Sequence, residues 1–176
     1  KAQNSLVDKG FYCCSASPII LIFIISFVVG FLISSSFFEK QISDLPIKRY
    51  SSLDNFLYIT CNNLVVFSIL MSGLLLFKIP TCISLLSNGF SLGFFFGTID
   101  HSQIITVSFS VFLHGFIELF GLFIGAYIGF LNISSIKKNI RGYFLLMIFG
   151  VVLIIIAGYI EVYITPLYYN KFIINN

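Results

Sequence analysis

The stretch IITVSFSVFLHGFIELFGLFIGAYIGFL, residues 104–131, decides the fold. It is apolar enough to lie in lipid, yet it contains His114 and Glu118. Four residues along a helix correspond to about 40° of rotation, so these two side chains share one face. Ionisable groups at membrane depth are costly and usually face a protein interior or a water-filled cavity. The stretch therefore predicts a membrane helix whose polar face is covered by other helices.

The composition of the whole chain is that of a polytopic membrane protein. Of the 176 residues, 58% are hydrophobic and only 10% are charged, and the mean hydropathy is +1.02. A soluble globular domain is far less apolar. The net charge is only +3, and no basic stripe with interleaved aromatic residues exists, so nothing favours a nucleic-acid partner. We therefore expect an all-α fold, a transmembrane helical bundle in the lipid bilayer.

Hydropathy divides the chain into three parts. An N-terminal interfacial segment at residues 1–17 precedes a transmembrane bundle at 18–166, and a short tail at 167–176 follows it. Each apolar run in the bundle has about the 20 residues that a spanning helix needs. Pro18 suits the first turn of a helix, and Pro166 suits the end of one. The five expected spans cover residues 18–38, 53–77, 79–99, 104–131 and 143–164.

The distribution of Lys and Arg gives an expected orientation. Five spans place the two termini on opposite sides of the membrane, and cytoplasmic segments carry more Lys and Arg. With the N-terminus in the cytoplasm, the inner segments hold six of the ten basic residues, and three of these six form the compact loop at residues 137–141. The sequence therefore favours a multi-pass protein of the bacterial cytoplasmic membrane with a cytoplasmic N-terminus.

Polar and small residues share the same helix faces. On the fourth span, His114, Glu118 and three glycines fall within a wedge of about 80°. Small residues on a polar face indicate contact with another helix rather than with lipid. We therefore expect one intramembrane polar cluster and several glycine contacts between helices. The predicted cluster is Asn62, Asn63, Asn88, His114, Glu118 and Glu161, and the predicted packing residues are Gly89, Gly93, Gly97, Gly121, Gly125, Gly129 and Gly158.

Three interpretations of the polar cluster stay open on the residues alone. In the first, it is a buried hydrogen-bond network, with amides completing the bonds of the histidine and the carboxyl groups. In the second, His114, Glu118 and Glu161 are zinc ligands, because three protein ligands and a water make a catalytic site. These three would then be the catalytic residues of a peptidase or peptide cyclase, although the HExxH pattern is absent. In the third, the two carboxyl groups carry protons or ions.

The order of these residues also resembles that of a known family. The elements are Asn62-Asn63, then Asn88-Gly89 with Leu92-Gly93, then His114-Gly115-x-x-Glu118-Leu119 followed by Gly125 and Gly129, and finally Ile160-Glu161 with Thr165-Pro166. In this order they resemble the stage II sporulation protein M family, over about residues 15–168 of the chain.

The resemblance implies a helical membrane protein of five or six spans that works with other membrane subunits. One implied role is a scaffold in a sporulation-type machine that remodels the cell envelope. Another is a partner in the maturation, export or immunity of a hydrophobic, membrane-active peptide of the circular-bacteriocin type, beside an ABC-type ATPase. A composition rich in Ile, Phe, Asn and Lys suits a Gram-positive bacterium. The alternative function is an intramembrane metal-dependent peptidase or cyclase.

Overall fold

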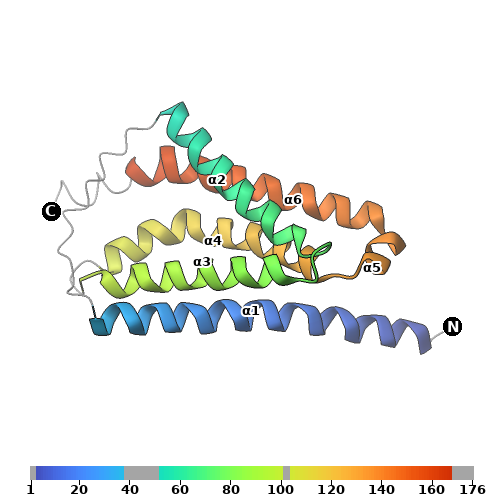
Figure 1. The fold of residues 1–176 in the computed structure, drawn as a ribbon. Coiled ribbons are helices and arrows are strands. Elements are labelled where there is room, and N and C mark those ends of the chain that lie inside the picture. The colour runs from blue at the N-terminus through green and yellow to red at the C-terminus, as the bar shows by residue number, and fades with distance from the viewer. Residues whose placement is uncertain (1–2, 38–51, 101–103, 168–176) are drawn as a thin grey trace.

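A bundle of long helices forms the whole of the described structure (Figure 1). The computed structural model describes residues 3–37, 52–100 and 104–167. Within these ranges there is no β-sheet. The helices are α1 (Gln3–Phe37), α2 (Leu53–Ser72), α3 (Ile79–Thr98), α4 (Ile104–Phe130), the short α5 (Ile133–Lys138) and α6 (Ile140–Tyr159), which continues into the π-helix η1 (Ile160–Ile164).

Five stretches of these helices are long and apolar enough to cross a membrane, which confirms the predicted fold class. Their outward-facing side chains are mostly large and apolar, as contact with lipid requires. Backbone groups in lipid must be bonded internally, and helices satisfy that requirement within each span. The five stretches are Ser17–Phe37, Leu53–Ser72, Ile79–Thr98, Val107–Phe130 and Ile140–Leu167.

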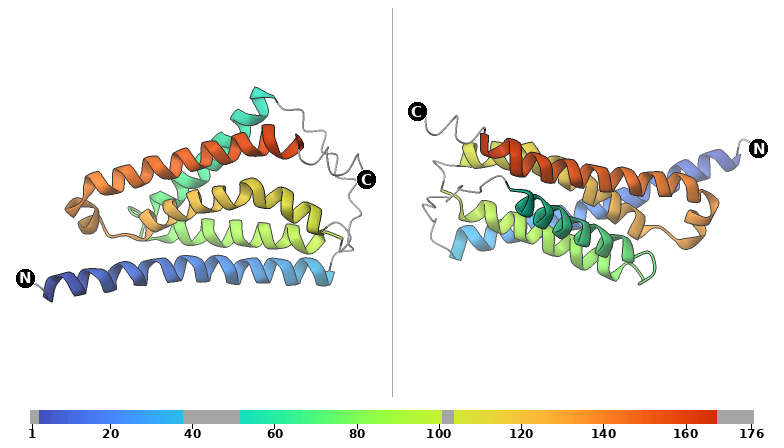
Figure 2. Two further views of the ribbon diagram at one scale, coloured as in Figure 1. Left: turned by 180° about the vertical axis from the view of Figure 1, so that it is seen from behind. Right: turned by 90° about the horizontal axis from the view of Figure 1, so that it is seen from above.

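Helix α4 lies at the centre of the bundle and contacts each of the other four spans. Helix α6 packs along it, α2 crosses it obliquely, and α3 lies between α4 and α1 (Figures 1 and 2). The N-terminal end of α1, the 73–78 connection and α5 gather at one end of the bundle. The start of α2 and the end of η1 lie at the other end (Figure 1). This arrangement places the sequence stretch with His114 and Glu118 in the interior.

Helices α1 and α3 run parallel in close contact, and glycines allow that contact. A Cβ atom on Gly93 would collide with the backbone of Phe27, and one on Gly97 would lie 2.7 Å from the carbonyl oxygen of Phe31. From the other side, a Cβ on Gly30 would collide with the carbonyl oxygen of Phe90. Backbones that approach this closely gain dispersion contacts and leave no room for larger side chains.

A second packing centre joins α2, α4 and α6 around the ring of Phe67, which is only 2% exposed. A Cβ on Gly125 would lie 2.7 Å from this ring, and one on Gly150 would lie 2.8 Å from it. Toward the end of α2, the buried hydroxyl of Thr81 donates a hydrogen bond to the carbonyl oxygen of Leu70 over 2.6 Å. That bond ties the start of α3 to the end of α2.

The N-terminal segment differs from the prediction, because α1 begins at Gln3 and runs without a break through Pro18. Residues 3–17 are therefore helical and continuous with the first span, and Pro18 is inside a helix instead of at its start. A proline in this place leaves one carbonyl without its helical N–H donor, and the hydropathy pattern carries no sign of that. The tail beyond Leu167 lies outside the described residues.

The second span ends five residues earlier than predicted, at Ser72. Phe77 and Lys78 adopt left-handed backbone conformations, with φ angles of 52° and 66°, and these turn the chain into α3. Pro80 lies in the first turn of α3, where its missing N–H is tolerated. The prediction extended the second span to Phe77 because the sequence stays apolar to that residue. Hydropathy measures the preference for lipid and carries no information about the direction of the backbone.

The last span begins three residues earlier than predicted and extends past Thr165 to Leu167. Asn139 caps its start by accepting a hydrogen bond from the Gly142 N–H over 3.1 Å. At its end, the Thr165 N–H donates to the carbonyl oxygen of Ile160, five residues earlier. Pro166 has no N–H to donate, and the wider π turn accommodates its ring without ending the helix.

Candidate functional site: a polar cluster inside the bundle

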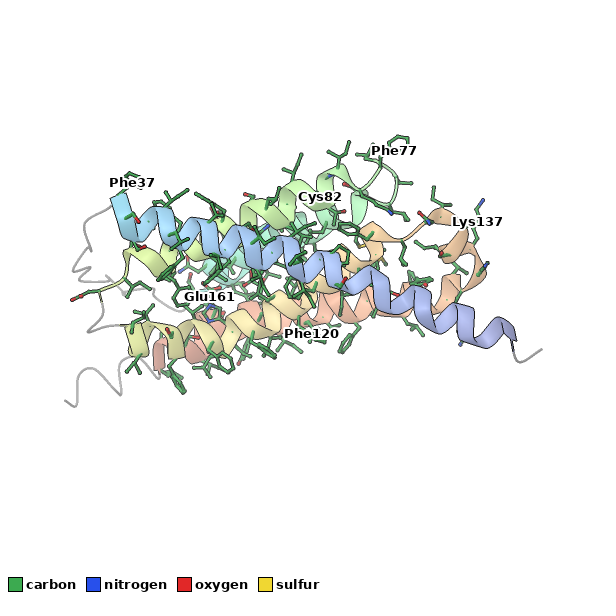
Figure 3. All side chains as sticks on the ribbon, turned by 90° about the horizontal axis from the view of Figure 1, so that it is seen from below. Phe37, Phe77, Cys82, Phe120, Lys137 and Glu161 are labelled. Atoms are coloured by element: carbon green, nitrogen blue, oxygen red, sulfur yellow. The ribbon has the colours of Figure 1, made fainter. Side chains whose placement is uncertain are left out.

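Two helices supply the centre of the polar cluster. Helix α4 presents His114 and Glu118 one turn apart, as the four-residue spacing predicts. The π-helix η1 presents Glu161, and Thr165 follows directly after η1. Single π turns are frequent at functional sites because they change the direction of the side chains that follow them. Figure 3 shows Glu161 in the bundle interior, well away from Lys137 at the end of α5.

The imidazole of His114 bridges the two helices. Its Nε2 atom lies 4.0 Å from Oε2 of Glu161, and its Nδ1 atom lies 3.3 Å from Oγ1 of Thr165. The side chains of His114 and Glu161 are only 14% and 17% exposed. Both ring nitrogens therefore face groups of the last span in a setting from which water is largely excluded.

Helix α2 completes the cluster through Asn63. This side chain is buried and lies beside the carboxyl group of Glu118. Glu118 also lies close enough to Glu161 for the two carboxylates to repel each other when both are charged. A buried charge needs donors to replace water, and an amide beside a carboxyl group can supply one. The cluster therefore joins three separate elements, α2, α4 and η1.

The two amides of the adjacent pair have different positions. Asn62 is exposed on α2, and its Nδ2 atom donates to Oδ1 of Asn63 over 3.4 Å. Rotation about α2 thus points Asn63 toward Glu118 and Asn62 away from it. Asn62 thus reaches the rest of the predicted cluster through its hydrogen bond to Asn63, and its convergence with the histidine and the carboxyl groups stays a prediction.

Asn88 lies at the edge of the cluster. Its Nδ2 atom donates to the carbonyl oxygen of Ser84 over 2.8 Å and approaches the Ser84 hydroxyl at 3.3 Å, one turn earlier on α3. Its side chain also lines a groove that His114 and Glu118 line from the facing helix. Asn88 thus shares a space with the cluster, while its amide hydrogen bonds stay within α3.

Thr60 is absent from both the predicted polar cluster and the predicted packing residues. It lies one turn before Asn63 on α2 and is buried, and its hydroxyl has no hydrogen-bond partner within the described structure. A Cβ on Gly158 would lie 2.5 Å from that hydroxyl oxygen. The threonine and the glycine allow α2 and α6 to meet beside the cluster. In the sequence, Thr60 lies three residues before Asn63, and Gly158 lies three residues before Glu161. These two spacings are the sequence signal for the contact between α2 and α6.

The remaining predicted packing glycines lie at helix contacts. A Cβ on Gly121 would lie 3.2 Å from the carbonyl oxygen of Gly150 on α6. One on Gly129 would collide with the carbonyl oxygen of Leu70 on α2, and one on Gly89 would collide with the Ser26 hydroxyl on α1. Glycines on the face of α4 that carries the cluster thus bring the neighbouring helices to it.

The cluster does not have the geometry of a metal site. Within residues 3–37, 52–100 and 104–167, no three His, Cys, Asp or Glu side chains are grouped so that they could hold a metal ion. His114 and Glu161 approach each other at 4.0 Å, while Glu118 lies beside Asn63. A catalytic zinc needs three protein ligands that converge on one point.

Comparison with known proteins places the chain in a family. The sequence profile described as "Stage II sporulation protein M" matches residues 19–166. This chain belongs to the stage II sporulation protein M family. The match includes nearly all of the five spans and the whole polar cluster.

One relative of the chain is an uncharacterized protein from Methanocaldococcus jannaschii. The two are 29% identical over 169 residues, covering 85% of this chain and 94% of the relative. No solved structure matches the chain. The resemblance inferred from the His-Gly-x-x-Glu-Leu and Ile-Glu…Thr-Pro segments is confirmed at the level of the family.

Proposed function

We propose that this protein is a non-enzymatic subunit of a cell-envelope complex in a bacterial cytoplasmic membrane. The observation that carries the proposal is the cluster of Asn63, Glu118, His114, Glu161 and Thr165. Its contacts join α2, α4 and η1 and hold the spans in one arrangement. Polar side chains that bond across helices fix how a membrane bundle packs. A bundle whose described outer side chains are mostly large and apolar suits a partner or scaffold in the membrane.

The second part of the proposal concerns what the complex does. The complex acts on a membrane-active, hydrophobic peptide of the circular-bacteriocin type, in maturation, export or immunity, or it remodels the envelope as a sporulation-type machine does. Family membership supports a membrane subunit and does not decide between these two roles. A Gram-positive host belongs to the same proposal.

The proposed orientation has the N-terminus in the cytoplasm. The basic side chains that the structure describes, Lys78, Lys137, Lys138 and Arg141, lie with the start of α1 at one end of the bundle (Figure 1). The end of the described chain lies at the opposite end. The positive-inside rule assigns the basic end to the cytoplasm. Lys40, Lys48, Arg49 and Lys171 lie outside the described residues.

An ABC-type ATPase is the proposed cytoplasmic partner, and the short basic loop at residues 137–141 is its contact. The test is to purify the tagged full chain from its native membrane after mild crosslinking, and to measure ATPase recovery and ATP hydrolysis. Replacing Lys137, Lys138 and Arg141 by alanine is expected to lower both, while Lys78→Ala at the same end serves as control. Equal recovery and hydrolysis in the triple variant would remove the ATPase contact. Purification of the chain without any other envelope protein would contradict the subunit role.

The alternative function, an intramembrane metal-dependent peptidase or cyclase, stays a hypothesis. It requires His114, Glu118 and Glu161 to converge on one ion. In the described structure the two nitrogens of His114 face Thr165 and Glu161, and Glu118 lies beside Asn63. We derive no catalytic step from this arrangement, because the side chains do not fit the ligand geometry.

A further inference from the structure

A groove of about 520 Å³ lies between α3 and α4 and connects the polar cluster with the outside of the bundle. Its polar lining includes Asn88, His114 and Glu118. Aromatic rings lie along it, and Phe112 and Phe116 are 65% and 60% exposed. An apolar groove with a few polar groups at its base is the usual form of a binding site in a helical bundle.

The charges at this groove are unequal. The cluster brings two carboxyl groups and one imidazole together, and one imidazolium can balance only one carboxylate. The Lys and Arg side chains that the structure describes lie at the far end of the bundle, as Lys137 does in Figure 3. A carboxylate without a matching cation is expensive at membrane depth. Glu118, which lines the groove, is therefore suited to a cation that arrives from outside the chain.

The depth of the groove restricts the source of that cation. Glu118 lies about 21 Å along α4 from Ile104, near the middle of a helix about 40 Å long. The hydrocarbon core of a bilayer is about 30 Å thick, so the charged part of a lipid headgroup stays far from this level. The cation must be carried to mid-depth by a segment that is itself apolar.

The described spans of a second copy of the chain do not carry such a cation. In the described spans, Lys is absent, and Arg141 lies at the very start of α6. A helix of another protein that bears Lys or Arg near its middle has the required charge. The wall of α4 from Ser108 to Leu122 is about 21 Å long, enough to contact roughly four turns of such a helix.

We propose that the groove between α3 and α4 binds a transmembrane helix of another protein, and that a Lys or Arg at mid-depth of that helix pairs with Glu118. The proposal rests on the proposed function as a membrane subunit and names the chemistry of one partner. The exposed Phe112 and Phe116 rings contact the apolar sides of the incoming helix. The pairing gives the bundle a preference among hydrophobic helices, because helices without a basic residue leave Glu118 unpaired.

The experiment uses two synthetic helices and the full chain in lipid nanodiscs. One peptide is a leucine–alanine transmembrane helix with a single central Lys, and the other has Leu at that position. Energy transfer from a dye on the peptide to a dye on the protein reports binding. We expect the Lys peptide to bind at least about tenfold more tightly than the Leu peptide. Glu118→Gln should remove that preference, while Asp54→Asn, at the exposed start of α2, should preserve it.

A second variant tests the groove itself. Ser91→Leu fills an exposed part of the groove without altering a charge, and it should weaken both peptides together. Circular dichroism and thermal unfolding establish that each variant is folded. The wild-type comparison of the two peptides stands even if a variant fails to fold.

Several outcomes would overturn the proposal. They are equal binding of the two peptides to the wild type, no binding of either, or an undiminished Lys preference in folded Glu118→Gln. A loss of preference in Asp54→Asn as large as in Glu118→Gln would mean that general charge attraction is measured. The nanodisc result does not depend on native partners. Failure of the copurification test therefore contradicts the subunit role separately.

Discussion

The Nε2 atom of His114 on α4 lies 4.0 Å from Oε2 of Glu161 in the π-helix near the end of the last span. The contact joins two segments that are distant in sequence, and Thr165 supports the other ring nitrogen at 3.3 Å. In a membrane, a polar contact of this kind selects one packing of the helices, since lipid offers the separated groups no alternative partner. The arrangement of the bundle thus depends on a small number of polar side chains.

The adjacent amides of α2 provide the sharpest comparison of buried and exposed polar groups. We expect Asn63→Leu to lower the free energy of unfolding by roughly 1–3 kcal/mol, because a buried amide beside the Glu118 carboxyl group is lost. Asn62→Leu should leave stability nearly unchanged, since this side chain is exposed. Thermal and denaturant unfolding in detergent micelles measures both. Equal losses in the two variants would show that Asn63 has no special role.

The contact between α1 and α3 depends on the absence of side chains along α3. Gly93→Ala should destabilise the bundle by about 1–3 kcal/mol, because the new methyl group would collide with the backbone of Phe27. Gly115→Ala is the matched control, because the nearest atom to its Cβ is a flexible Val111 methyl group at 3.3 Å. Unfolding of the two variants side by side gives the difference. A control that loses as much stability as Gly93→Ala would contradict the packing argument.

Phe67 is the large buried ring between α2, α4 and α6. Phe67→Ala should lower the free energy of unfolding by about 3–5 kcal/mol, because the cavity lies against Gly125 and Gly150 and cannot close by side-chain movement. Phe120→Ala on α4 removes the same atoms from a ring that is 53% exposed, and its effect should be small. Figure 3 labels this control residue. An equal loss of unfolding free energy in Phe120→Ala and Phe67→Ala would contradict this role of the buried ring.

The zinc hypothesis is tested by elemental mass spectrometry of protein purified in zinc-containing buffer. We expect equal, substoichiometric zinc in wild type and His114→Ala, because His114, Glu118 and Glu161 do not converge on one point. About one zinc per chain in wild type, lost in the variant, would instead support a three-ligand catalytic site.

The sequence predicts the fold and much of the cluster because both follow from local periodicity. Apolar runs of about 20 residues identify the five spans, and a spacing of four places His114 and Glu118 on one face. The ends of the spans are less predictable. Ser72 ends α2 because two residues with left-handed backbone conformations turn the chain, although the residues between are apolar.

Contacts between distant helices are the part that periodicity does not determine. An adjacent pair such as Asn62 and Asn63 differs by about 100° of rotation, and only the packing of α2 selects which amide faces inward. The π turn before Thr165 likewise changes the direction of Glu161, and no residue pattern in the sequence predicts this turn. The groove between α3 and α4 arises from three-dimensional packing, so its lining could not be read from either helix alone.

A double-mutant cycle on His114 and Glu161 tests most directly the claim that the cluster holds the spans together. The four proteins are wild type, His114→Leu, Glu161→Gln and the double variant, each unfolded under identical detergent conditions. The account predicts a coupling free energy of roughly 0.6–2 kcal/mol, the range of polar contacts between membrane helices. Strictly additive losses, with no coupling between the two residues, would contradict it.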